Sequence, residues 1–181
     1  MSATAPVFTI GHSTRTIPEF VEILGSAAVQ LVIDVRTVPR SRTNPQYNED
    51  ALPAELKPHG IGYGRIAALG GLRGRSRDVP PEVNAFWNNR SFHNFADYAL
   101  SDAFESGLET LIALADESAT AIMCSEAVWW RCHRRIIADY LLLRKREVTH
   151  LMGPGRLDAA SLTPGAVPVD GRLIYPATAS G

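Results

Sequence analysis

A strand, a helix and a second strand follow one another at the start of the chain. The apolar run Val7-Phe-Thr-Ile10 is typical of a buried strand, and Thr16-Ile-Pro-Glu19 matches the capping box that opens a helix. Apolar residues then recur at helical spacing as far as Leu24, and Leu31-Val-Ile-Asp34 is a second buried strand. Two such strands joined by a helix run parallel within one sheet. This stretch therefore restricts the chain to α/β folds.

The same periodicities predict the remaining elements. We expect a helix from Asn94 to Leu100, a second helix that begins at Ser101, a buried strand over 119–123, a helix from Arg131 onward, and a last strand over 148–152. Prolines and glycines interrupt residues 37–90, where we expect only a short helix near 50–57 and a short strand near 61–63.

The chain beyond residue 152 is rich in Pro, Gly and Ala. Asp170-Gly171 lies there between two apolar runs, which is a strong signal for a hairpin. We predict a single three-layer α/β core domain over residues 1–152, with a mainly parallel sheet of about five strands. Residues 153–181 are predicted to form a Pro/Gly-rich tail with a short hairpin.

The composition and the N-terminal sequence bear on the cellular location of the protein. No apolar run approaches the roughly 20 residues that span a membrane. The first residues, Met1 to Pro6, lack the charged and apolar regions of a signal peptide. The two cysteines lie eight positions apart and do not make a disulfide framework. We therefore expect a cytoplasmic protein that does not enter a membrane.

The net charge of −1 conceals an uneven distribution along the chain. Residues 36–77 contain eight Lys or Arg residues against three acidic ones, whereas residues 78–126 contain nine acidic residues against Arg90. A basic face of this kind favours an anionic ligand or a nucleic acid. A solvated, arginine-rich loop explains the same composition, and the sequence leaves both explanations open.

Polar and ionisable side chains follow the predicted strands at the point where each strand ends. Because parallel strands have their carboxyl ends at one edge of the sheet, these side chains should meet there, near helix N-termini that favour anions. Ionisable residues at the ends of hydrophobic strands have no role in packing, whereas a functional site needs them. They are His12, Ser13 and Arg15 after the first strand, Asp34 and Arg36 after the second, Cys124 and Glu126 after the strand at 119–123, and Cys132, His133 and Arg134 nearby.

Three hypotheses account for the cysteines. In the first, Cys124 is a nucleophile whose thiolate is favoured by helix N–H groups, by Arg131 and Arg134, and by a histidine. The loop after Cys124 contains no glycine, however, and so suits a backbone anion cradle poorly.

In the second hypothesis, the cysteines and a histidine bind a metal. Zinc ligands are usually spaced two to four residues apart, and no CxxC occurs here. Adjacent Cys132 and His133 would also point about 100° apart on a helix, which hardly allows them to share one ion.

In the third hypothesis, Cys124 is a core cysteine and Cys132 packs beneath the sheet. The histidines, glutamate and arginines would then bind a ligand without help from sulfur, and we expect neither a metal nor a cofactor. Adjacent indoles in a loop cannot face the same way, so of Trp129 and Trp130 we expect one, Trp130, to line the pocket and stack on a planar ligand.

Five segments resemble a known family. They are Thr9-Ile-Gly-His-Ser13, Ile33-Asp-Val-Arg36, Leu69-Gly-Gly71, Asn94-Phe-Ala-Asp-Tyr98, and Cys124-Ser-Glu126 through Cys132-His-Arg134. Their combination is similar to the bacterial family of domains of unknown function numbered 488, DUF488, in register from about residue 8 to 152. The resemblance implies a fold region and the motifs G-H-S, D-V-R, C-x-E and C-H-R, and it implies no reaction.

These observations favour an enzyme that acts on an anionic small molecule, phosphate-bearing or nucleotide-like, at the strand ends. Arginines would bind the anion, carboxylates would orient or deprotonate, and histidines would act as acid and base. The candidate catalytic residues are His12, Asp34, Cys124, Glu126 and His133, and the candidate ligand-binding residues are Ser13, Arg15, Arg36, Trp130, Arg131 and Arg134. The alternative is a non-catalytic protein that binds nucleic acid or nucleotides through the arginine-rich segment 36–77.

Overall fold

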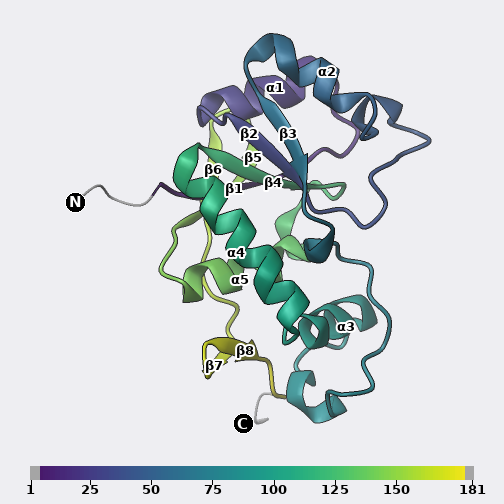
Figure 1. Ribbon diagram of the computed structural model, residues 1–181, viewed down its shortest axis with the longest axis vertical. Coiled ribbons are helices and arrows are strands. Elements are labelled where there is room, and N and C mark those ends of the chain that lie inside the picture. Colours follow the sequence, from purple (N-terminus) through teal and green to yellow (C-terminus); the bar gives the residue numbers. More distant parts are fainter. Residues whose placement is uncertain (1–4, 178–181) are drawn as a thin grey trace.

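Five parallel strands and one antiparallel edge strand form the central sheet (Figure 1). The computed structural model describes residues 5–177. The strand order is β3-β2-β4-β1-β5-β6, and β6 runs antiparallel to β5. The strands are β1 (Val7–Gly11), β2 (Leu31–Asp34), β3 (Gly62–Arg65), β4 (Thr120–Cys124), β5 (Val148–Gly153) and β6 (Arg156–Ala159). The predicted mainly parallel sheet is thus confirmed, with β6 as an additional strand.

The register brings the carboxyl ends of three strands together. β4 lies at the middle of the sheet, between β1 and β2. Gly11 of β1 is level with Cys124 of β4, and Asp34 of β2 is level with Met123. The residues that follow these strands therefore leave the sheet at one edge, which is where ligands bind in open parallel sheets.

Helices cover both faces of the sheet and complete three layers (Figure 1). The helices are α1 (Ile17–Ser26) and α2 (Leu52–Leu56) on one face, and α3 (Arg90–Tyr98), α4 (Asp102–Glu117) and α5 (Arg134–Leu143) on the other. Neighbouring residues of β2 point into different cores, since Val32 packs with α1 and Ile33 packs with the α4 and α5 face. Apolar residues on both faces of a strand are typical of a parallel sheet covered by helices.

The start of α3 differs from the prediction. The helix begins at Arg90 and not at Asn94, because Asn89 Oδ1 accepts the backbone N–H groups of Ser91 and Phe92 and so caps the first turn. Asn94 lies inside the helix, and its side chain donates to a loop carbonyl instead. The predicted helix that begins at Ser101 is confirmed, with Ser101 as the N-cap of α4.

The start of α5 also differs from the prediction. A short 3₁₀ turn, Trp129–Arg131, follows β4, and α5 begins only at Arg134. Cys132 between them has an extended backbone, with φ −131° and ψ 150°. Cys132 therefore precedes the helix and is free of its geometry, while His133 is the residue immediately before α5.

Residues 37–90 contain short elements, as predicted. Both α2 and β3 lie within a residue or two of the positions that the sequence indicates, and 3₁₀ turns connect the rest, at Pro45–Tyr47, Lys57–His59, Ala67–Leu69 and Pro81–Asn84. Beyond β6, a hairpin of β7 (Val167–Val169) and β8 (Arg172–Ile174) confirms the turn predicted at Asp170-Gly171. Both turn residues have positive φ, as a two-residue hairpin turn requires. Within residues 5–177, no helix has both the length and the apolar surface needed to cross a bilayer.

Candidate functional site

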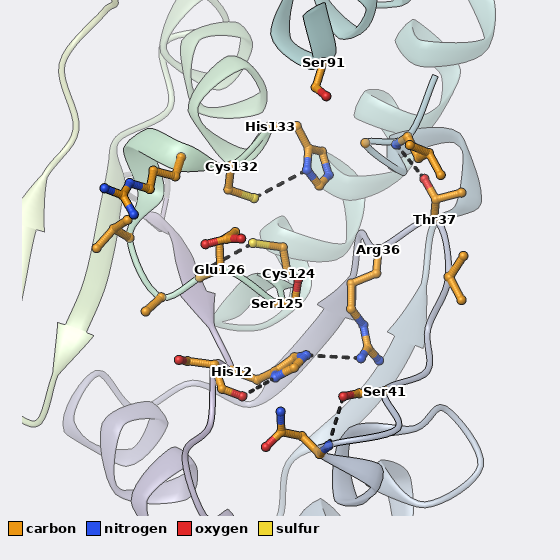
Figure 2. Close-up of a pocket in the computed structure, with 18 of the residues that line it drawn as sticks. His12, Arg36, Thr37, Ser41, Ser91, Cys124, Ser125, Glu126, Cys132 and His133 are labelled. Carbon is orange, nitrogen blue, oxygen red and sulfur yellow. Dashed lines mark hydrogen bonds between the residues drawn. The ribbon is translucent and has the colours of Figure 1, made fainter. Parts of the chain in front are cut away.

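A cleft of about 950 Å³ opens where β1, β2 and β4 end. Figure 2 shows His12 and Arg36 on one side of it and Cys132 and His133 on the other, with Cys124 between them. The structure thus brings seven of the candidate residues to one cavity: His12, Ser13, Arg36, Cys124, Glu126, Arg131 and His133. Asp34, Arg15, Trp130 and Arg134 do not line it.

Arg134 lies fully buried behind the cleft. Its Nε donates to Cys124 Sγ at 3.0 Å, its Nη1 donates to Thr9 Oγ1 at 2.9 Å, and its Nη2 donates to the carbonyl of Glu126 at 2.7 Å. No carboxylate within residues 5–177 forms an ion pair with it. The guanidinium therefore supports the wall that carries Cys124 and does not reach a ligand in the cleft.

Cys132 and His133 form a thiol–imidazole pair at the cleft wall. His133 Nε2 lies 2.8 Å from the carbonyl oxygen of Val35, which can only accept, so Nε2 carries the proton. His133 Nδ1 is then unprotonated and lies 3.4 Å from Cys132 Sγ. This is the arrangement in which a histidine can take the proton of a cysteine. Burial lowers the pKa of His133, which keeps the ring neutral and leaves the lone pair of Nδ1 facing Cys132.

The two thiols have different acidities. Burial raises the pKa of Cys124 well above its usual value. Burial also acts to raise the pKa of Cys132, but the neighbouring Cys124 thiol and the charge and N–H groups of Arg134 outweigh it and lower the pKa to about 7. Cys132 Sγ accepts the backbone N–H of Arg134 at 3.4 Å, in the first turn of α5, where a helix favours negative charge. Cys132 is therefore the thiol that ionises near neutral pH.

Asp34 holds Arg36 in place and has no free oxygen for catalysis. Its carboxylate accepts Arg36 Nε at 2.9 Å and Nη2 at 2.6 Å, the backbone N–H of Arg36 at 3.0 Å, and the hydroxyl of Tyr63 at 2.5 Å. Asp34 is fully buried. The pair fixes the guanidinium of Arg36 at the cleft edge, so Asp34 positions a side chain of the site and does not face the cleft.

His12 is held as a neutral ring. Its Nδ1 donates to the carbonyl of Ser13 at 2.9 Å, which leaves Nε2 to accept from Arg36 Nη1 at 3.3 Å. The ring stacks on Tyr47 with 4.3 Å between centroids. Burial, followed by the charges of Arg36 and Arg15, lowers the pKa of His12 to about 4. Ser13 has φ +48°, an uncommon conformation for a residue with a side chain, and it turns the carbonyl that fixes this tautomer.

Two glycines allow the backbone to approach the site closely. A Cβ at Gly11 would collide with the carbonyl of Glu126, where the end of β1 crosses the loop after β4. A Cβ at Gly71 would collide with Nδ1 of His133, the atom that faces Cys132. Gly71 therefore packs directly on the ring of His133.

Two of the candidates outside the cleft, Arg15 and Trp130, have other contacts. Arg15 donates to the carbonyls of Gly11 and Met152, which joins the ends of β1 and β5. Trp130 is 45% exposed and makes an edge contact with Trp129 outside the cavity. Of the two indoles, Trp129 is the more enclosed and stacks on His150 with 4.6 Å between centroids.

Most of the cleft-lining residues in segments 37–44, 71–72 and 89–92 were not predicted from the sequence. They include Thr37, Val38, Arg40, Ser41, Thr43, Asn44, Gly71, Leu72, Asn89, Ser91 and Phe92. These residues lie in loops and in the first turn of α3, where no periodicity indicates which side chains face a cavity. Cys132 was named near the strand ends but not among the candidate catalytic residues, although its predicted place in the first turn of a helix, where a thiolate is favoured, was a visible signal.

The structure bears on the metal hypothesis. Across the described residues, no three His, Cys, Asp or Glu side chains are grouped so that they could hold a metal ion. The predicted separation of Cys132 and His133 was wrong, because Cys132 is extended and not helical, and Sγ lies 3.4 Å from Nδ1. The two atoms form a hydrogen-bonded pair instead.

Comparison with known proteins gives one match. The family described as Domain of unknown function DUF488 matches residues 16–141, more than half of the chain. The chain belongs to the DUF488 family. No curated protein and no solved structure is similar to it at a significant level. The DUF488 match includes Arg36, Cys124, Cys132 and His133, whereas His12 precedes it.

Proposed function

We propose that this DUF488 protein is an enzyme that attacks an electrophilic group of an anionic small molecule with the thiolate of Cys132. The observation that carries the proposal is the surroundings of Arg134. A fully buried guanidinium with no carboxylate partner in residues 5–177 is costly unless another anion neutralises it. The groups beside it are two cysteines that line the cleft. A thiolate supplies the missing charge.

The nucleophile has a base as well as a counter-charge. His133 Nδ1 accepts the Cys132 proton across 3.4 Å, and the carbonyl of Val35 holds the ring through Nε2. The resulting thiolate would form a bond to the electrophilic atom and displace a leaving group, as in transferases and hydrolases that use a cysteine. Glu126 is exposed at the cleft and available to accept or return a proton during the second step.

The charge of the cleft favours an anion. Arg36, Arg40 and Arg131 line it, while Glu126 is the single carboxylate among the lining residues that the structure describes. A concave surface with an excess of positive charge raises the local concentration of anionic ligands. The guanidiniums of Arg40 and Arg131 offer N–H groups that fit phosphate or carboxylate oxygens, whereas Arg36 is largely engaged by Asp34 and His12.

The size and rim of the cleft favour a ligand larger than an inorganic ion. A volume of about 950 Å³ is that of a site for a nucleotide-sized molecule. Val38 and Leu72 line the cleft and are 59% and 70% exposed. A ligand that has an apolar part beside its anionic group would cover both side chains. We place this chemistry in the cytoplasm, where a reducing environment keeps both cysteines free.

Alkylation tests the proposal without knowledge of the substrate. Iodoacetamide is applied from pH 6 to 9, and labelling of each cysteine is followed by mass spectrometry. Cys132 should react faster than Cys124 at pH 7, with a midpoint near pH 7, and inorganic pyrophosphate should slow the reaction. Cys132→Ser should remove the fast phase, whereas the matched variant Cys124→Ser should retain it. Resistance of both thiols below pH 8 in the folded protein would reject the nucleophile.

The alternative, a nucleic-acid binder, has less support from the contacts of the arginines. Arg36 is bound to Asp34, Arg65 donates to the carbonyl of Thr37, and Arg73 lies over the ring of Tyr98. These side chains serve the fold, and only part of segment 36–77 remains for phosphates. A nucleic-acid binder should show affinity for DNA or RNA that falls steeply as salt is added, whereas the proposed enzyme should show none.

A further inference from the structure

Both cysteines of the chain lie at the same wall of the cleft. Arg134 contacts each of them, through Nε to Cys124 Sγ at 3.0 Å and through its backbone N–H to Cys132 Sγ at 3.4 Å. Each thiol also affects the acidity of the other: the pKa of Cys124 is raised and that of Cys132 is lowered. Figure 2 shows both sulfur atoms at the cavity. A single nucleophile needs one thiol, so the second requires its own explanation.

The second thiol is buried and poorly acidic. Burial raises the pKa of Cys124 well above its usual value, and its S–H points to the carbonyl of Glu126, 3.7 Å away. Such a thiol does not react first. It can, however, complete a reaction that has begun on the sulfur beside it, as a resolving cysteine does.

From this juxtaposition we propose that Cys124 and Cys132 are a modification site, which a hydroperoxide such as hydrogen peroxide converts reversibly to a disulfide. The inference rests on the Cys132 thiolate of the proposed function and adds a role for Cys124. The cleft admits a molecule as small as hydrogen peroxide to both sulfurs, because both residues line it. Residues 125–131 connect the two cysteines, and Cys132 precedes α5, so its side chain can turn without breaking a helix.

The chemistry balances in two steps. The Cys132 thiolate attacks one peroxide oxygen, a sulfur–oxygen bond forms, the oxygen–oxygen bond breaks, and hydroxide leaves and takes a proton to become water. Cys132 is now a sulfenic acid, oxidised by two electrons. The sulfur of Cys124 then attacks it, the sulfur–oxygen bond breaks, and the thiol proton leaves with the hydroxyl group as a second water. A dithiol reverses the change by thiol–disulfide exchange.

A Cys124–Cys132 disulfide would inactivate the site. It removes the nucleophile and the negative charge beside Arg134 in one event. The guanidinium keeps its contacts with Thr9 and the carbonyl of Glu126 but loses its anionic partner. Oxidation therefore switches off the proposed reaction, and reduction restores it.

The experiment uses the full chain and hydrogen peroxide at pH 7. Remaining thiols are blocked with N-ethylmaleimide, and peptides are analysed by mass spectrometry without reduction. The wild-type protein should form an intramolecular Cys124–Cys132 disulfide that dithiothreitol reverses. Cys124→Ser should stop at a sulfenic acid on Cys132 that dimedone labels. In Cys132→Ser, dimedone labelling of Cys124 should be slower by about tenfold or more, because its thiolate is scarce.

The outcomes separate this inference from the proposed function. If Cys132 is alkylated rapidly at pH 7 but peroxide carries it to sulfinic or sulfonic acid while Cys124 stays free, the modification site is rejected and the nucleophile stands. If the disulfide joins two chains, as a non-reducing gel of dilute protein would show, the modification site is also rejected. If neither cysteine reacts with iodoacetamide or peroxide below pH 8, both proposals fail. The wild-type protein alone shows whether the Cys124–Cys132 disulfide forms, so the test holds even if a serine variant does not fold.

Discussion

Arg134 Nε donates to the sulfur of Cys124 at 3.0 Å, at a depth where an arginine normally has a carboxylate for a partner. The same residue gives its backbone N–H to the sulfur of Cys132. One arginine therefore links α5 to both thiols and to the middle of β1 through Thr9. The position of the guanidinium explains how the residues around Cys124 and Cys132 are held together and why the pKa of Cys132 is lowered.

Replacing Arg134 should make Cys132 less acidic. Arg134→Met removes the charge that lowers the pKa of Cys132, so alkylation of Cys132 at pH 7 should slow by about tenfold. The variant should also lose about 2–4 kcal/mol of unfolding free energy, because Thr9 and the carbonyl of Glu126 lose a donor.

Arg146→Met is the matched control for Arg134→Met. Arg146 pairs with Asp116 at the protein surface and has no contact with a thiol. Its replacement should leave the alkylation profile of Cys132 unchanged and cost under about 1 kcal/mol of stability. Equal reactivity of Cys132 in the Arg134→Met and wild-type proteins would show that Arg134 does not stabilise the thiolate.

Gly71→Ala should disturb His133 more than it disturbs the fold. The new methyl group would collide with Nδ1 of His133 and force the ring away from Cys132. We expect a slower alkylation of Cys132 at pH 7 and a loss of about 1–3 kcal/mol in unfolding free energy. Gly74→Ala is the control three residues along the same loop, because a Cβ there meets nothing within 4 Å. Similar effects of the two substitutions on Cys132 would contradict a specific contact with His133.

The core of the fold and half of the site were predictable from periodicity. The strand–helix–strand pattern at the N-terminus and the strand before Cys124 place polar residues at one sheet edge, because parallel strands end together. His12, Arg36, Cys124 and His133 therefore meet as the sequence indicates. The positions of these four residues could be predicted without knowing the conformation of any loop.

The remainder depended on contacts that leave no periodic signal. Arg134 was expected to bind a ligand, yet its N–H groups are used by Cys124, Thr9 and a carbonyl. Cys132 was expected on a helix, where it could not have faced His133, but a 3₁₀ turn delays the start of α5. A single residue of extended backbone thus decides which cysteine is paired with a base.

Acidification should destabilise the protein through its buried histidines. Burial and the charge of Arg134 lower the pKa of His150 to about 3, and burial lowers the pKa of His12 to about 4, both below the value near 6.5 of an unfolded histidine. As pH falls below 6.5, the unfolded chain binds protons that the folded chain excludes. The stabilising effect of the neutral rings is therefore present above pH 6.5 and is lost between pH 6.5 and about 4, and down to about 3 for His150.

Urea unfolding between pH 7 and 4.5 measures this effect. The wild-type protein should lose on the order of 1–3 kcal/mol per buried histidine over that range. His150→Gln removes one titrating ring while its amide oxygen can still accept the hydroxyl of Thr9, which now lies 2.7 Å from His150 Nδ1. Its stability should vary less with pH. His59→Gln, at an exposed position, should follow the wild-type curve, and a His150→Gln curve parallel to wild type would refute the assignment.

Gly11 and Gly25 should respond in opposite directions to the same substitution. At the end of β1, Gly11 lies against the carbonyl of Glu126, which also accepts from Arg134, so a methyl group there must push the loop after β4 outward. Gly11→Ala should therefore cost about 3 kcal/mol or more of unfolding free energy. Gly25 lies within α1 with open space around it, and Gly25→Ala should raise the unfolding free energy by about 0.5–1 kcal/mol.

The two variants also test whether the crossing of β1 and the loop after β4 shapes the cleft. In Gly11→Ala, displacement of the Glu126 carbonyl would remove an acceptor from Arg134 and an acceptor from the Cys124 thiol. Alkylation of Cys132 should then lose its midpoint near pH 7, while Gly25→Ala should keep it. Urea unfolding and the pH profile of alkylation measure the two effects on the same protein samples. If Gly11→Ala were as stable and as reactive as wild type, the close approach of the two segments would not be a determinant of the site.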